Sequence, residues 1–127
     1  ALASGDFETA VAEFDKLLAA SPNDTEAKAG RAQAALLSRA AKLDPAQALA
    51  AADANPTDVA AQLAAADAEL LGGAIPSAFG RLIALIRDST AAEREQARVR
   101  LLELFETVAP DDPAVLKARR DLVSALF

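Results

Sequence analysis

The sequence of 127 residues contains no cysteine, histidine, tryptophan, tyrosine or methionine. Without cysteine the chain has no disulfide bond, no thiol nucleophile and no thiolate metal site. Without histidine it lacks the commonest general acid–base group and the commonest metal ligand. We therefore expect no enzyme activity, no catalytic residue, no bound cofactor and no metal site.

Positive charge is also scarce. The chain carries 13 Lys and Arg against 19 Asp and Glu, which gives a net charge of −6. The excess lies in residues 1–75, with eleven acids and five bases, whereas residues 76–127 hold eight of each. A nucleic-acid binder needs a cationic surface, and anionic membranes repel an acidic one. We expect neither nucleic acid nor membrane as a partner.

Long hydrophobic runs are missing too. The longest uncharged stretch near the middle, Leu70–Gly80, is broken by glycine and proline and is shorter than the roughly 20 apolar residues that span a bilayer. No signal-peptide pattern is present. The missing initiator methionine and the start inside a repeat, described below, indicate a piece of a longer protein.

Alanine, by contrast, makes up 35 of the 127 residues and is the best helix former. Asp44-Pro45 and Asp112-Pro113 are typical helix starts, Gly72-Gly73 is a typical helix stop, and Thr90 and Glu93 have the spacing of a capping box. Between these breaks the apolar residues recur with a helical period. The sequence predicts an all-α fold without a sheet, with helices at about 6–20, 25–42, 45–54, 57–71, 75–88, 91–108 and 113–126.

One helix carries a repeat pattern. Gly5, Ala10, Phe14, Leu17 and Pro22 follow the spacing Gly-x4-Ala-x3-Phe-x2-Leu-x4-Pro, which resembles the second helix of a tetratricopeptide repeat. The resemblance implies antiparallel helix pairs stacked as a short right-handed solenoid. We expect residues 1–54 to hold this first repeat, truncated at its start, plus irregular helices. Residues 57–127 would hold a second, degenerate repeat and a C-terminal helix pair.

In the second repeat, Ala78 follows Gly73 by five residues, as Ala10 follows Gly5. Both alanines are therefore expected at close helix crossings.

Paired carboxylates are the only candidates for acid–base chemistry. Asp67 and Glu69 lie two apart and do not share a helix face, and Asp111 flanks the cap at Asp112. A catalytic carboxyl also needs burial or a close like charge, and nothing in the sequence indicates either. The pairs are interpreted as helix-surface and capping residues.

The last helix has an apolar arc of roughly 200°, twice what one packing contact needs. Either the whole arc packs, with arginine stems lying along it, or one side docks and the other meets a partner. On the second interpretation the partner-binding residues are Arg119, Arg120, Leu122, Leu126 and Phe127. A large aromatic residue and arginines near a chain end favour such a role.

A second candidate surface lies near Lys28 and Arg31, which stand where the repeat usually has bulky apolar residues. A tetratricopeptide clamp for a free C-terminal carboxylate resembles lysine and asparagine spaced on successive first helices. The matching asparagines are missing here, so we do not expect a carboxylate tail as the ligand.

Three features together point to one family: the repeat Gly5–Pro22, the irregular segment Asp44–Pro56, and the segment Asp112–Phe127, which ends Arg-Arg-x-Leu-x3-Leu-Phe. They resemble the C-terminal tetratricopeptide region of the thioredoxin-fused co-chaperones, the chaperedoxins. The resemblance implies a thioredoxin-like domain upstream, a cytoplasmic location, and binding of unfolded clients or of a chaperonin or similar chaperone. The alternative is a tetratricopeptide scaffold for docking or dimerisation in an unrelated assembly.

Overall fold

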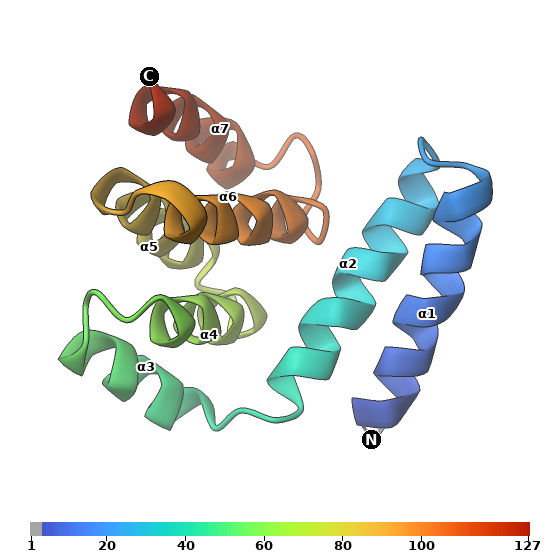
Figure 1. The fold of residues 1–127 in the computed structure, drawn as a ribbon, viewed down its shortest axis with the longest axis horizontal. Coiled ribbons are helices and arrows are strands. Elements are labelled where there is room, and N and C mark those ends of the chain that lie inside the picture. Colours follow the sequence, from blue (N-terminus) through green and yellow to red (C-terminus); the bar gives the residue numbers. More distant parts are fainter. Residues whose placement is uncertain (1–3) are drawn as a thin grey trace.

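The computed structural model describes residues 4–127, and all seven expected helices are present (Figure 1). Every observed boundary lies within three residues of the predicted one, and residues 4–127 contain no strand. The prediction of an all-α fold is confirmed. The helices are α1 (Ser4–Ala20), α2 (Thr25–Ala40), α3 (Pro45–Ala54), α4 (Val59–Leu71), α5 (Ile75–Asp88), α6 (Ala91–Phe105) and α7 (Pro113–Leu126).

Local signals explain most helix ends. Four helices begin after an aspartate whose carboxylate accepts a backbone N–H of the first turn at 2.8–3.2 Å, which satisfies an otherwise unpaired donor. Proline occupies the first turn after Asp44 and Asp112, as predicted. The four capping residues are Asp24, Asp44, Asp58 and Asp112.

The end of α4 is a Schellman motif. The Ala74 N–H donates to the Glu69 carbonyl at 2.8 Å, and the Gly73 N–H donates to the Leu70 carbonyl at 3.1 Å. Gly73 has a φ of +88°, which glycine adopts at little steric cost. The helix stop predicted at Gly72-Gly73 is therefore confirmed.

The capping box predicted at Thr90 is wrong. Thr90 is the N-cap of α6, but its side chain makes no capping hydrogen bond. The next residue, Ala91, has a φ of +50°, so the chain enters the helix through a left-handed step and the hydroxyl does not reach the first turn. Arg94 instead closes the preceding helix end, because its Nε donates to the carbonyls of Ile86 and Ser89, both at 3.1 Å.

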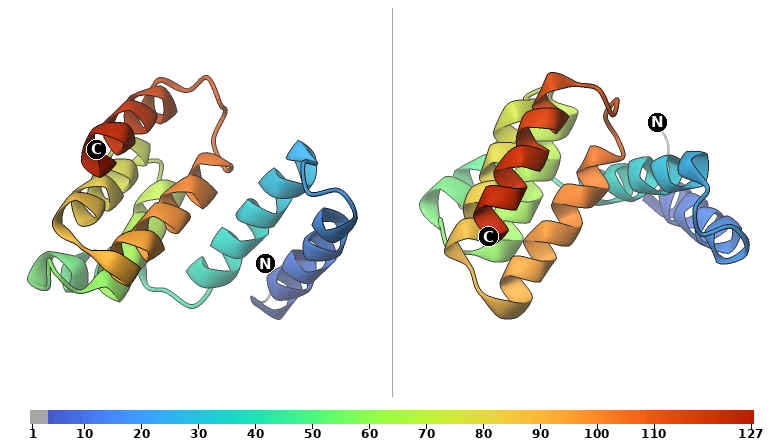
Figure 2. Two further views of the ribbon diagram at one scale, coloured as in Figure 1. Left: turned by 45° about the horizontal axis from the view of Figure 1, so that its top comes forward. Right: turned by 90° about the horizontal axis from the view of Figure 1, so that it is seen from above.

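The seven helices form two parts of unequal size. We call α3–α7 the body and α1–α2 the arm. In the body α3 packs on α4, α4 packs on α5, and α5 contacts both α6 and α7. The arm is a helix pair that reaches the body through contacts of α2 with α4 and α6 (Figures 1 and 2). The division into residues 1–54 and 57–127 stays a prediction, as does the handedness of the stack.

The core lies in the body. Its buried side chains come mainly from α5, α6 and α7, and the rings of Phe79 and Phe105 meet edge to face with centroids 5.0 Å apart. Among the described residues the arm gives this cluster one side chain, Leu36, which is 1% exposed. Ala78 is completely buried, as its repeat position predicts, whereas Ala10 in the arm is only half-buried.

The arm is held together largely by its own contacts. Phe14 of α1 packs over Gly30 of α2 so closely that a Cβ at Gly30 would lie 2.6 Å from the Phe14 Cε1 atom. Lys42 pairs with Glu8 at 3.0 Å, and Arg31 pairs with Asp15. Each of these contacts joins the first helix of the chain to the second helix or its end.

None of the helices in residues 4–127 combines the length and the apolar character that crossing a bilayer requires.

Candidate interaction surfaces

Helix α7 docks on α5 through one face. Val115 and Ala118 are buried on this face, and Leu122, which the sequence placed in the partner surface, is only 9% exposed. Leu126 is half-buried against the same core. Leu122 therefore packs in the core and does not lie on the outward side of α7.

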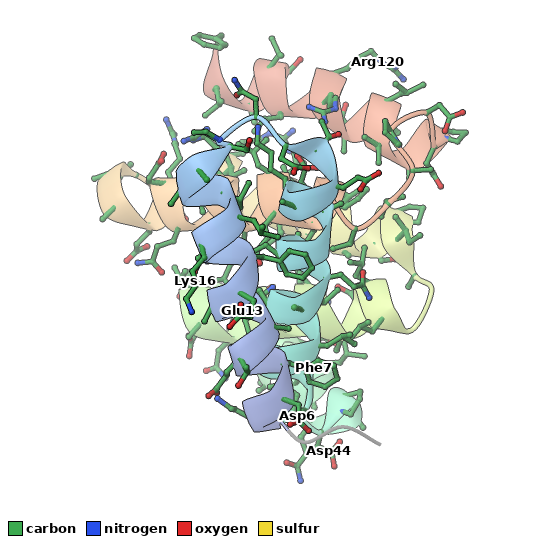
Figure 3. All side chains as sticks on the ribbon, turned by 90° about the vertical axis from the view of Figure 1, so that its right-hand side faces the viewer. Asp6, Phe7, Glu13, Lys16, Asp44 and Arg120 are labelled. Atoms are coloured by element: carbon green, nitrogen blue, oxygen red, sulfur yellow. The ribbon has the colours of Figure 1, made fainter. Side chains whose placement is uncertain are left out.

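A second apolar face of α7 points outward. Leu116 is 46% exposed, Val123 58% and Phe127 99%, and Arg120 is exposed between them. Their spacing of four, three and four residues places them along one side of the helix. In Figure 3 Arg120 lies on α7 and points away from the other helices. We call these four residues the outer stripe.

Arg119 has a different role from Arg120. Its guanidinium carbon lies 4.8 Å from the centroid of the Phe105 ring, which is a cation–π contact. Because Phe105 belongs to α6, this contact joins α7 to the rest of the body. Of the five α7 residues predicted to bind a partner, Arg120 and Phe127 lie on the outward face.

Lys28 and Arg31 line a groove between the arm and α6, whereas the outer stripe lies along α7. The groove has a volume of about 320 Å³. Lys28 is exposed, whereas Arg31 pairs with Asp15 inside the arm. The remaining lining residues are Leu18, Ala32, Leu102, Glu103 and Glu106.

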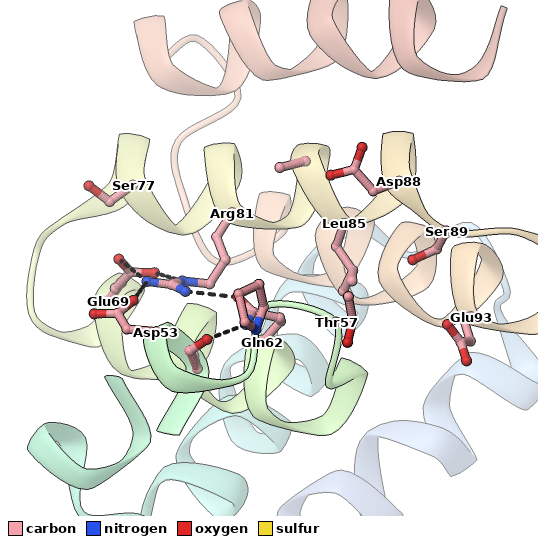
Figure 4. A pocket seen from close by; sticks show the side chains of 13 residues that line it. Asp53, Thr57, Gln62, Glu69, Ser77, Arg81, Leu85, Asp88, Ser89 and Glu93 are labelled. Carbon is pink, nitrogen blue, oxygen red and sulfur yellow. Dashed lines mark hydrogen bonds and ion pairs between the residues drawn. The ribbon is translucent and has the colours of Figure 1, made fainter. Parts of the chain in front are cut away.

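A larger groove, of about 650 Å³, lies between α3, α4, α5 and the start of α6 (Figure 4). On its wall Arg81 donates from Nε to Glu69 Oε1 at 2.7 Å and from Nη1 to Gln62 Oε1 at 2.8 Å. The hydrogen bond to Glu69 raises the pKa of Arg81. Gln62 in turn donates to the carbonyls of Ala52 and Asn55 at 2.8 and 3.1 Å. These bonds join α3, α4 and α5 and engage the side chains of Arg81, Glu69 and Gln62.

The most buried charge is Asp67 of α4, whose side chain is 1% exposed. Arg39 donates to both of its oxygens, at 2.9 and 3.2 Å, and Arg100 donates to Oδ2 at 2.8 Å. Arg39 also donates to Glu103 at 3.1 Å. The four residues come from α2, α4 and α6, and we call them the charge cluster.

Burial and neighbours act differently on the two arginines of the charge cluster. Burial lowers the pKa of Arg100 below its ordinary value. Burial lowers the pKa of Arg39 too, but the hydrogen bond and charge of Asp67, with help from Glu103, outweigh it and raise that pKa. Both guanidinium groups remain charged at neutral pH.

The expectation that no carboxyl is buried is wrong for Asp67. The sequence did hold a signal, because Asp67 lies between Leu63 and Leu70 on the apolar face of its helix. Both of its oxygens accept guanidinium hydrogen bonds, and it lines neither of the two grooves described above. Within residues 4–127 no three acidic side chains gather as a metal site would require.

Comparison with known proteins agrees with this fold. The family model described as tetratricopeptide repeat matches residues 38–127. Over 126 residues, 99% of its length, the chain is 42% identical to uncharacterized proteins of Mycobacterium bovis and Mycobacterium tuberculosis, and it spans 41% of their length. No solved structure matches the chain. On the match over residues 38–127, the chain belongs to the tetratricopeptide repeat family.

Proposed function

We propose that this chain is a protein-binding module that captures its partner with the outer stripe of α7. Tetratricopeptide repeats generally mediate protein–protein interaction, and stacked helical repeats offer extended surfaces for it. The chain has the residue types that such binding uses and lacks those that catalysis uses most.

The observation that carries the proposal is the exposure of three large apolar side chains in one row. Leu116, Val123 and Phe127 are each at least 46% exposed, although α7 already buries another face against α5. An exposed apolar row is the kind of surface that marks protein-interaction sites, and arginine is enriched among energetically dominant interface residues. Arg120 would add orientation by pairing with a carboxylate of the partner.

For the biological setting we propose a cytoplasmic co-chaperone of the thioredoxin-fused type. The outer stripe would then bind apolar segments of unfolded clients, or a chaperonin or similar chaperone. The support is the segment Asp112–Phe127 with its Arg-Arg-x-Leu-x3-Leu-Phe ending, together with relatives more than twice as long as this chain, which leave room for a further domain. A scaffold for docking or dimerisation is the second candidate, because the same apolar stripe could meet a copy of itself.

The test compares Val123→Ser with Val99→Ser. Val99 lies on α6 and is 50% exposed, so the control removes a valine of similar exposure from another helix. Binding to a chemically unfolded client and to a purified chaperonin is measured by titration, and folding by the melting temperature. We expect Val123→Ser and Arg120→Glu to weaken binding at least about tenfold with little change in melting temperature. Val99→Ser should bind normally.

Two results would count against the proposal. If Val123→Ser and Val99→Ser bound equally well, the partner surface would lie elsewhere on the chain. The groove near Lys28 and Arg31 would then be the next candidate. A concentration-dependent dimer in sedimentation that Val123→Ser abolishes, without client or chaperonin binding, would favour the scaffold.

A further inference from the structure

We propose that the arm detaches from the body as a unit, and that Leu36 and Arg39 are the two side chains that hold it in place. The proposal concerns residues 4–40 and is independent of what the outer stripe binds.

The apolar attachment of the arm is small. Among the described residues only Leu36 connects the arm to the buried cluster, and no side chain of α1 from Gly5 onward is fully buried. The tight packing of Phe14 over Gly30 and the ion pair of Arg31 with Asp15 lie inside the arm, and Lys42 of the adjoining link pairs with Glu8 of the arm. The arm would therefore keep its own contacts after it leaves the body.

The polar attachment is concentrated in Arg39. This side chain donates to Asp67 on α4 and to Glu103 on α6, and so joins the arm to two helices of the body. A buried carboxylate left without a partner is costly, which would normally keep such a contact closed. Here Arg100, a residue of the body, also donates to Asp67 at 2.8 Å, so the carboxylate would keep one guanidinium partner if Arg39 left.

Arg100 thus lowers the free-energy cost of separating Arg39 from Asp67. Repulsion between the two arginines also opposes the docked state, because the positive charge of Arg39 disfavours the charged form of Arg100. After release, Asp67 keeps one guanidinium and Arg39 reaches solvent, so neither charge is left buried and unpaired.

The link between arm and body lies at residues 41–44. The Lys42 and Leu43 amides bond back to the last turn of α2, and Asp44 caps α3, which packs on α4. A rotation within these four residues would leave both flanking helices intact. It would uncover the apolar surface that Leu36 covers and open the groove of Lys28 and Glu106.

Hydrogen exchange on the unmodified chain is the first test. The exchange is measured under conditions where its rate reports the opening equilibrium. If the arm opens separately, its slowest-exchanging amides should exchange at least tenfold faster than the slowest-exchanging amides of α5 and α6. Equal protection in arm and body would mean that they unfold as one unit, and the proposal would be wrong.

The second test uses the absence of cysteine, which allows specific labelling of two introduced thiols. Lys16→Cys on α1 and Gln96→Cys on α6 are both exposed positions, and spin labels there report the distance from arm to body. Arg39→Gln should shift the distance distribution towards longer values while the helix content by circular dichroism is retained.

The matched control is Arg31→Gln. Arg31 is also on α2, but it pairs with Asp15 within the arm. This variant should keep the distance distribution of the unmodified chain. If Arg39→Gln leaves the distribution unchanged, or if both variants shift it equally, Arg39 does not hold the arm.

Discussion

Gly30 and Gly80 both lie inside helices, yet a methyl group would meet different surroundings at each. A Cβ at Gly30 would press on the Phe14 ring, whereas a Cβ at Gly80 would have nothing within 4 Å. Alanine stabilises an open helix position by up to about 1 kcal/mol relative to glycine, but overpacking costs about 1–3 kcal/mol. We expect Gly80→Ala to raise the free energy of unfolding and Gly30→Ala to lower it.

Urea denaturation followed by circular dichroism measures both changes. Gly80→Ala is the matched control, because the substitution is the same and the site is also helical. If both variants gained stability, the Phe14 ring would have moved aside at no cost, and the tight packing of α1 on α2 would not contribute to folding.

At the scale of single elements, the end of α4 depends on one residue. Gly73 has φ +88°, where an L side chain is strained by about 1–2 kcal/mol, whereas its neighbour Gly72 has an ordinary φ of −77°. Gly73→Ala should therefore lower the free energy of unfolding by about 1 kcal/mol more than Gly72→Ala. Thermal melts of the two variants compare them directly, and equal melting temperatures would contradict the Schellman assignment.

Helix ends such as this one could be predicted because their signals are local. Asp44-Pro45, Asp112-Pro113 and Gly72-Gly73 act on backbone groups within a few residues of themselves. Thr90 shows the limit of such signals, because the unusual φ of Ala91 is not visible in the spacing Thr-x-x-Glu.

The faces of α7 could be predicted only in part. The width of the apolar arc was compatible with one wide packing face or with two surfaces, and it did not say which side meets α5. That depends on where Phe79 and Phe105 lie, since they belong to the core on which α7 packs. Leu122 was therefore assigned to the partner surface although it is buried, and Leu116 and Val123 were not assigned to it.

For the whole molecule, the least predictable feature is the charge cluster. Arg39 meets Asp67 across 28 residues and Glu103 across 64 residues of sequence. No periodicity brings such residues together, because their meeting depends on how α2, α4 and α6 stack. The sequence does single out Asp67 as a charge on an apolar face, but it does not identify which basic residues pair with it.

The chemistry of the whole chain leads to a further prediction. Histidine and cysteine are absent, and the buried carboxylate of Asp67 and the partly buried carboxylate of Glu69 are both held by arginines. We expect the purified chain to show no hydrolase or redox turnover and to retain no transition metal, since these functions rely mainly on His and Cys. Elemental analysis after dialysis against a chelator is the check, and one metal ion per chain would overturn the prediction.

The long-range attachment of the arm has a consequence for the order of folding. Helices α3–α7 contact close neighbours in sequence, and such local contacts form early. Within this chain the arm is made before the body, but Asp67 and Glu103 follow Arg39 by 28 and 64 residues. A nascent arm can form its own helix pair yet has no body to dock on until α6 has been made. Among these seven helices, α1 and α2 are therefore made before the body but can dock only after it has formed.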